Sequence, residues 1–186
     1  VGGAELRLHR PVQREVIFAC DKPWEGNWSG LPTYIQDGDT YRMYYTGGQW
    51  RRGHTSICYA ESRDGVHWTR PELGLVAFNG SKKNNIILPR KGIIAFVPFK
   101  DTNPGCRPDE RFKAMVARIT PTRGLYGYVS PDGVHWKLMQ ERPVMTTGQF
   151  DSQNVAFWDS VRGRYVAYYR QCRGLDDSLS DKGPQL

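Results

Sequence analysis

The sequence lacks any long hydrophobic run, any sustained helical pattern and any closely spaced cysteine pair. No apolar run approaches the roughly 20 residues that span a bilayer, so we expect no membrane partner. Apolar residues show no 3.6-residue period over three turns, and 20 Gly and 12 Pro argue against a helical bundle. The four cysteines form no C-x-x-C pair, so we expect no metal site and no cofactor, and their disulfide state stays open.

Positive charge is present without being gathered into one surface. The net charge is +7, from 26 Lys and Arg against 19 Asp and Glu. The basic residues are scattered, with only short clusters such as Arg51-Arg52 and Lys82-Lys83. Nucleic-acid binders concentrate such charge on a helix or within a recognisable motif, and neither is present here. We therefore expect no nucleic-acid partner and interpret the charge as a solvated basic surface.

Aromatic residues and short β-type runs are abundant. Aromatics make up 12% of the chain, which favours a packed core over disorder. The predicted strands fall into three sets, 31–36, 41–45 and 56–61, then 93–99, 112–117 and 125–129, then 155–158 and 165–169. Asp-Gly turns between alternating hydrophobic residues favour antiparallel hairpins, so we predict an all-β fold.

One seven-residue segment occurs twice, as Ser62–Trp68 and as Ser130–Trp136, and the copies differ only at Arg63 and Pro131. We call each copy a box. Asp is suited to cap such a turn, Gly to supply a positive φ, and Trp to pack between neighbouring sheets. The polar members are therefore predicted to be structural rather than catalytic: Asp64, His67, Asp132 and His135.

A unit of about four short antiparallel strands, repeated about every 62 residues, is what a β-propeller blade needs. We predict an incomplete propeller of about two and a half four-stranded blades. It occupies residues 1–172, with blade 1 at about 29–70, blade 2 at about 92–138, the start of blade 3 at about 150–170, and an irregular tail at 173–186. Closed propellers need at least four blades. We therefore expect a fragment, a truncated paralogue or a piece completed by another chain, with self-association through open blade edges.

Several segments resemble one group of proteins. They are 23–27, 41–45, 58–68, 71–74, 79–86 and 150–159. These segments look like five-bladed propeller proteins similar to the N-terminal domain of glycoside hydrolase family 32 and to families 43 and 68. The resemblance runs roughly from Ala4 to Cys172, about half of such a domain. It implies a five-bladed propeller, an oligo- or polysaccharide partner and a secreted or periplasmic location. It also implies glycosidase chemistry through paired carboxylates in the axial funnel.

At the first inner strand, the resemblance would place a catalytic Asp at Leu31, so that acid is missing. Glu25 is the nearest carboxylate and becomes a catalytic candidate, although it could equally bond to backbone amides of its own loop. Trp24 and Asn27 are substrate-binding candidates. Trp50 offers another stacking face, whereas ordinary packing is favoured for Trp28.

At the second inner strand, Ile94-Ala95 holds no titratable group, and Asp101 at its far end is interpreted as a turn cap. At the third, Asp151 is the best catalytic candidate, because it loosely resembles an Asp that holds sugar hydroxyls in family 32. Gln153 and Asn154 are substrate-binding candidates beside it.

Two functions stay open: a partial glycoside hydrolase-like module, or a non-catalytic carbohydrate-binding or interaction propeller. Leu31 and Ile94-Ala95 favour the non-catalytic module, whereas Glu25 and Asp151 keep the hydrolase-like module open. We expect the 186 residues alone to be poorly active, because half a funnel does not exclude water. The sugar, its linkage, the stereochemical outcome and the general acid are left undetermined.

Overall fold

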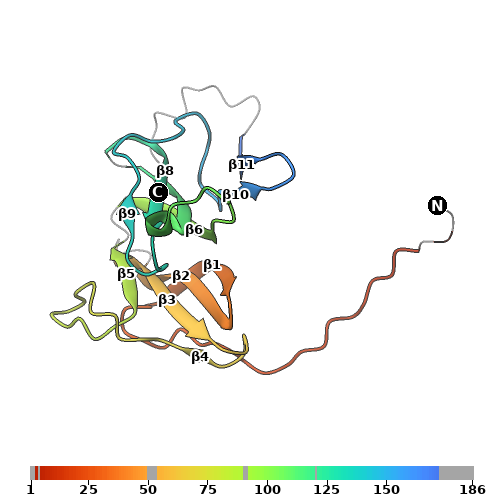
Figure 1. Ribbon diagram of the computed structural model, residues 1–186. Coiled ribbons are helices and arrows are strands. Elements are labelled where there is room, and N and C mark those ends of the chain that lie inside the picture. Colours follow the sequence, from red (N-terminus) through yellow and green to blue (C-terminus); the bar gives the residue numbers. More distant parts are fainter. Residues whose placement is uncertain (1–2, 4, 50–53, 90–91, 120, 172–186) are drawn as a thin grey trace.

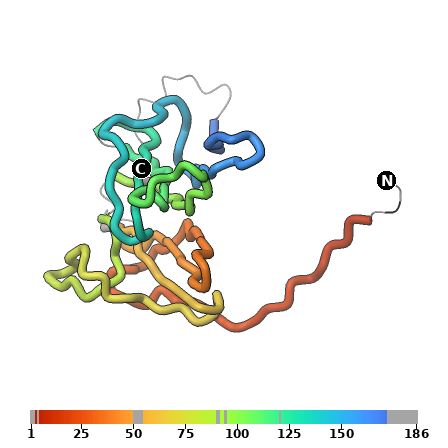
Figure 2. The backbone as a smooth tube through the Cα atoms, viewed as in Figure 1, coloured from red at the N-terminus to blue at the C-terminus, as the bar shows by residue number. Residues whose placement is uncertain are grey.

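The computed structural model describes residues 3, 5–49, 54–89, 92–119 and 121–171. The predicted all-β fold is confirmed, since the described residues form antiparallel strands and one short 3-10 helix, η2 (Pro108–Glu110). None of the described helical residues forms a helix long and apolar enough to cross a membrane. Figures 1 and 2 show two sheets packed together, a smaller hairpin beside them and an extended N-terminal segment leading away.

Two sheets repeat the same up-and-down order. Blade 1 runs β1-β2-β3-β4, with β5 paired to β3, and blade 2 runs β6-β7-β8-β9. Blade 1 comprises β1 (Trp28–Asp37), β2 (Thr40–Gln49), β3 (His54–Ser62), β4 (Trp68–Thr69) and β5 (Ile86–Pro89). Blade 2 comprises β6 (Ile93–Lys100), β7 (Phe112–Arg118), β8 (Gly124–Ser130) and β9 (Lys137–Leu138). This repetition is the predicted propeller-blade pattern.

The third unit is a hairpin of β10 (Val155–Asp159) and β11 (Arg164–Tyr168). Both β1 and β10 contact β6, so the first strands of the three units lie next to one another, as inner strands do at a propeller axis (Figure 1). Val155, Phe157 and Tyr168 are exposed on this hairpin. Self-association through this open edge stays a prediction.

The two boxes adopt matching hydrogen-bonded turns, as their sequences predicted. Asp132 Oδ1 accepts from the backbone amides of Val134 and His135 at 2.9 and 2.8 Å, and Asp132 Oδ2 lies 2.7 Å from His135 Nδ1. Asp64 repeats all three contacts in the first box, at 2.8, 2.8 and 2.6 Å. Each aspartate therefore caps its own turn.

The box tryptophans each pack on the first strand of their own blade, and Trp136 also joins two blades. Trp68 contacts Tyr34 of β1, and Trp136 contacts Phe96 of β6, with ring centroids 5.8 and 5.1 Å apart. Trp136 also meets Tyr44 of blade 1 edge-on at 6.2 Å. The main core lies at this junction, so Trp136 packs between sheets as predicted.

Three cysteines are described, and all are free thiols. Cys20 is exposed, Cys106 is half-buried, and Cys58 is buried in blade 1. Burial and the nearby Glu25 carboxylate raise the pKa of the Cys58 thiol. Cys58 is therefore a packing residue, as expected for a buried thiol, while Cys172 and the predicted tail lie outside the described residues.

The turn of the second box makes stability depend on pH. Burial acts to raise the pKa of Asp132, but bonds from the His135 amide and ring outweigh it and lower the pKa from 3.8 to about 2. The carboxylate therefore stabilises the fold above pH 4, and this contribution is lost as the pH falls through about 2. We expect Asp132→Ala to cost about 1 kcal/mol at pH 7. In urea unfolding, the difference from wild type should shrink between pH 4 and pH 2. Asp39→Ala, at an exposed turn, is the control; a pH-independent difference would contradict the assignment.

The two box glycines differ in what a side chain would meet. Both have positive φ, +76° at Gly65 and +79° at Gly133, so alanine is strained at either position. A Cβ at Gly65 meets nothing within 4 Å, whereas one at Gly133 would lie 2.6 Å from the Tyr44 hydroxyl of the neighbouring blade. We expect Gly65→Ala to cost about 1 kcal/mol and Gly133→Ala clearly more. Equal urea midpoints for the two variants would show that the blades do not approach there.

Candidate functional site

The three inner strands all begin at backbone irregularities. In β1 the register on β2 shifts at Leu31, which has a φ of +52°, and in β6 the register on β7 shifts just after Ile93. Phe150, shortly before β10, has a φ of +55°. Side chains other than glycine rarely adopt such angles, and strain of this kind persists only where the surroundings hold it in place.

An apolar cluster holds these strand starts together. Ala95, Phe150 and the partly buried Leu31 belong to one cluster, and Gln153 Nε2 donates to the Pro32 carbonyl at 3.3 Å. The start of β10 is thereby tied to the start of β1. This meeting point, which we call the axial junction, is where the resemblance placed the catalytic acids. The Ile94 side chain is not among those that the structure describes.

Asp151 presents a carboxylate at the axial junction. Its side chain is 43% exposed, and its Oδ2 pairs with the Arg170 guanidinium. Within the described part of the chain, Asp151 Oδ1 accepts no hydrogen bond. Gln153 is also exposed, two residues further on. Asp151 and Gln153 are therefore placed where a ligand from solvent would reach them.

Asn154 is oriented differently from its predicted neighbours. It is 1% exposed, and its Nδ2 donates to the carbonyls of Ser152 at 2.9 Å and Phe150 at 3.3 Å. Asn154 thus holds the turn that presents Asp151. Its Oδ1 and the Thr33 hydroxyl of β1 are buried without a hydrogen-bond partner among the described residues. Each such group costs about 1–3 kcal/mol, so a water or a ligand donor at either one would be stabilising.

Glu25 lies in a sealed polar network. The residue is 0% exposed, and Oε1 accepts from the Tyr45 hydroxyl at 2.5 Å and from Arg70 Nε at 2.7 Å. Oε2 accepts from Arg70 Nη2 at 3.2 Å and from the Lys22 backbone amide at 2.9 Å. A carboxylate with both oxygens engaged in this way is closed to substrate. The geometry favours the structural interpretation of Glu25 over the catalytic one.

Trp24 belongs to the same network. Its indole N–H donates to Asn85 Oδ1 at 2.7 Å, and its ring lies edge-on to Phe78 at 6.3 Å. Asn85 Nδ2 in turn donates to the Tyr45 hydroxyl at 2.8 Å, and burial raises the pKa of Tyr45. This network fixes the segment before β1 onto the cluster of Met43, Tyr45, Cys58, Ala60 and Ile86, which is distinct from the axial cluster.

For the remaining candidates the structure gives the exposure of Asn27 and Trp28 and does not describe Trp50. Asn27 is exposed in the turn before β1, after Gly26, which packs directly on Gly48. Trp28 is half-buried, in keeping with packing. Trp50 lies outside the described residues. Of the six predicted site residues, the structure therefore brings Asp151, Gln153 and Asn154 together and places Glu25 and Trp24 elsewhere.

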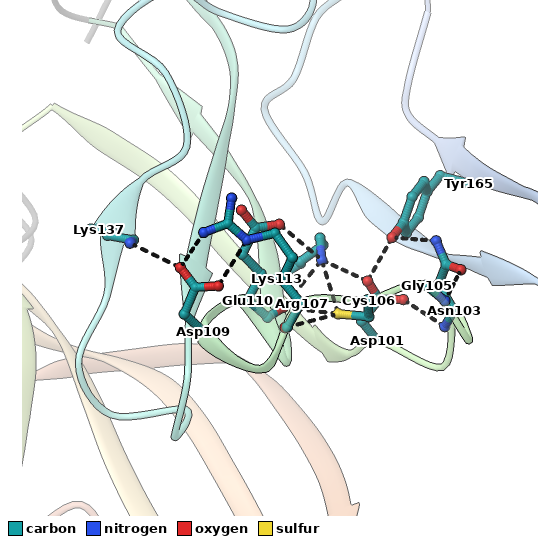
Figure 3. A network of polar contacts seen from close by, with 10 residues as sticks. All are labelled: Asp101, Asn103, Gly105, Cys106, Arg107, Asp109, Glu110, Lys113, Lys137 and Tyr165. Carbon is teal, nitrogen blue, oxygen red and sulfur yellow. Dashed lines mark hydrogen bonds and ion pairs between the residues drawn. The ribbon is translucent and has the colours of Figure 1, made fainter.

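Sequence reasoning missed a second buried carboxylate network (Figure 3). Asp101 does accept from the Asn103 amide at 2.9 Å, as the predicted turn cap requires. Its Oδ2 also accepts from Lys113 Nζ at 2.6 Å and from the Tyr165 hydroxyl at 2.6 Å. Burial acts to raise the pKa of Asp101, but Lys113 and Tyr165 hold it below its usual range. The network ties blade 2 to β11. Its one sequence signal was Lys113, a charged residue followed by the apolar run Ala114–Ala117 of β7.

Removing the cation from this network should be strongly destabilising. Asp101 is 0% exposed and Lys113 is 10% exposed, so Lys113→Met would leave a buried carboxylate without its charge partner. We expect a loss of about 3 kcal/mol in urea unfolding, and a smaller loss in the Asp101→Asn/Lys113→Met double variant. Arg107→Met, at an exposed ion pair, is the control. Additive effects of the two substitutions would show that the pair is not coupled.

Among the described residues, no group of three or more His, Cys, Asp or Glu is arranged to hold a metal ion. No family model matches the sequence. Two uncharacterized proteins of Mycobacterium tuberculosis, MT1551 of strain CDC 1551 / Oshkosh and Rv1502 of strain ATCC 25618 / H37Rv, are each 33% identical over 116 residues. The match covers 57% of this chain and 32% of each relative, so the chain spans about a third of the length of these curated relatives.

Solved structures similar to this chain are glycoside hydrolase-type proteins. A glycosyl hydrolase from Bacteroides ovatus has a TM-score of 0.42 and 16% identity, covering 72% of this chain and 39% of its own. The same values hold for a structure from work on GH130 mannoside phosphorylases and glycoside hydrolases that target β-1,2 mannosidic linkages in Candida mannan. A putative glycoside hydrolase from B. ovatus ATCC 8483 has a TM-score of 0.40 and 19% identity, covering 74% and 43%. Scores at this level carry no inference about activity, and membership of families 32, 43 or 68 stays a prediction.

Proposed function

We propose that this chain is part of a carbohydrate-binding propeller module, in which Asp151 and Gln153 hold sugar hydroxyls at the axial junction. The observation that supports this most directly is the exposed Asp151 carboxylate, oriented by Arg170 beside the point where β10 meets β1. A carboxylate accepts from two neighbouring hydroxyls, and the Gln153 amide both donates and accepts. Together they match the alternating donors and acceptors of a sugar.

Glycoside hydrolysis is the second candidate function, favoured by the resemblance of residues 150–159. That reaction needs two carboxyl groups flanking one bond. In the sequence around the three inner-strand starts, 28–33, 93–97 and 150–156, Asp151 is the only carboxylate. Glu25 is closed to substrate by its four hydrogen bonds. The residues of this chain therefore support binding better than turnover.

Neutralising Asp151 separates these functions. We expect the 186-residue chain to bind oligosaccharides in a glycan array and in calorimetry, and Asp151→Asn to weaken binding at least tenfold, about 1.4 kcal/mol. Asp39→Asn, on an exposed turn, is the matched control and should bind as wild type does. With chromogenic furanosides and pyranosides, we expect no steady turnover by the chain alone.

Three outcomes would count against the proposal. Binding of no glycan in the array would refute it, and so would equal affinities of wild type and Asp151→Asn. Steady turnover that is abolished in Asp151→Asn would establish the second candidate function instead. Circular dichroism of each variant checks that a loss of binding does not come from unfolding.

A further inference from the structure

A separate hollow of about 400 Å³ lies where the second box meets blade 1. Leu75 and Val76 line it from the loop of blade 1, and Trp136 from the second box, with Asp109, His135 and Lys137 also in its wall. Small-molecule sites commonly have volumes of about 300–1,000 Å³ with an apolar lining and a few polar groups. The hollow belongs to the box side of the blades, and none of its lining residues takes part in the axial junction.

We propose that this hollow is a second carbohydrate-binding site, which takes one neutral sugar unit. Trp136 is fixed before any ligand arrives, because its indole N–H donates to the Gly133 carbonyl at 2.9 Å and its ring packs against Phe96 and Tyr44. Trp136 is half-buried and is among the residues that line the hollow, so a ligand there would contact a tryptophan whose position is already set. Such a surface suits the C–H face of a sugar at little entropic cost.

The polar groups of the hollow favour a neutral, hydroxyl-rich ligand over an ion. Asp109 and Lys137 bring one charge of each sign to the wall and lie 3.6 Å apart, and Arg107, which is outside the wall, also pairs with Asp109 at 2.9 Å (Figure 3). His135 uses Nδ1 for Asp132 and keeps Nε2 for other contacts. The hollow thus offers a carboxylate that only accepts, an ammonium that only donates, and an imidazole nitrogen. Hydroxyls pair with all three, whereas an ion of either sign would meet one attractive and one repulsive charge in the wall.

The first box provides an internal comparison. A hollow of about 350 Å³ also adjoins that box, but polar residues line it throughout, among them Thr40, Glu61 and Thr69. Trp68, the counterpart of Trp136, is not part of its wall, and its ring lies against Tyr34. The same turn therefore borders an aromatic hollow in blade 2 and a fully polar one in blade 1. Only the hollow at the second box combines apolar residues with charged groups of both signs.

Titration of the 186-residue chain with methyl glucoside, methyl mannoside and methyl galactoside tests this site, read from the NMR shift of the Trp136 indole N–H. We expect at least one glycoside to bind at millimolar concentration and to shift that signal. Asp109→Asn/Lys137→Gln, both at exposed or half-exposed side chains, should weaken this binding at least fivefold. Thr69→Ala, in the hollow beside the first box, is the matched control and should leave glycoside binding unchanged.

This test is independent of the test at the axial junction. Asp151→Asn should not alter the Trp136 titration, so failure at one site does not imply failure at the other. The proposal is overturned if no glycoside shifts the Trp136 signal, or if Asp109→Asn/Lys137→Gln binds as wild type does. Glucuronate or glucosamine binding tenfold more tightly than the neutral glycosides would overturn the neutral-ligand assignment.

Discussion

The close approach of the second box to blade 1 is the contact on which the rest of the structure depends. Gly133 leaves no room for a side chain beside the Tyr44 hydroxyl, and Arg42 of blade 1 donates to the Asp132 carbonyl at 2.7 Å. Trp136 fills the adjoining space between the sheets. Because this contact sets how blade 2 lies on blade 1, it also sets where β1 and β6 converge, and therefore the shape of the axial junction.

The two ends of the inner strands are held by different forces. Where β1 and β6 end, the Asp37 carboxylate pairs with Arg42 and Lys100, both at 2.9 Å, and with Arg111. Just beyond β6, Asp101 pairs with Lys113. Where the strands start, an apolar cluster and strained backbone bring them together instead. Ion pairs thus hold the ends of the inner strands together, whereas near the strand starts the Asp151 side chain is half-exposed.

The sequence predicted what local chemistry determines and missed what distant partners determine. The box turns were readable because Asp, Gly and Trp act within seven residues, and the strand sets were readable from their turns. The role of Glu25 could not be predicted, because its partners Arg70 and Tyr45 are 45 and 20 residues away in the sequence. Tyr165 is 64 residues from Asp101, so only the cap to Asn103 was visible. A carboxylate's role depends on partners that the fold supplies.

Two kinds of carboxylate occur in this chain, buried ones that are already paired and exposed ones that a ligand can reach. Glu25 and Asp101 are fully buried, Asp37 is nearly so, and each has a cationic partner that offsets its desolvation. Such pairs lock sheets and loops together, and their oxygens are already engaged. Asp151 has a cation too, but keeps one oxygen and almost half of its surface open to solvent. In this scaffold the exposed carboxylate beside strained backbone is therefore more accessible to a ligand than the buried ones.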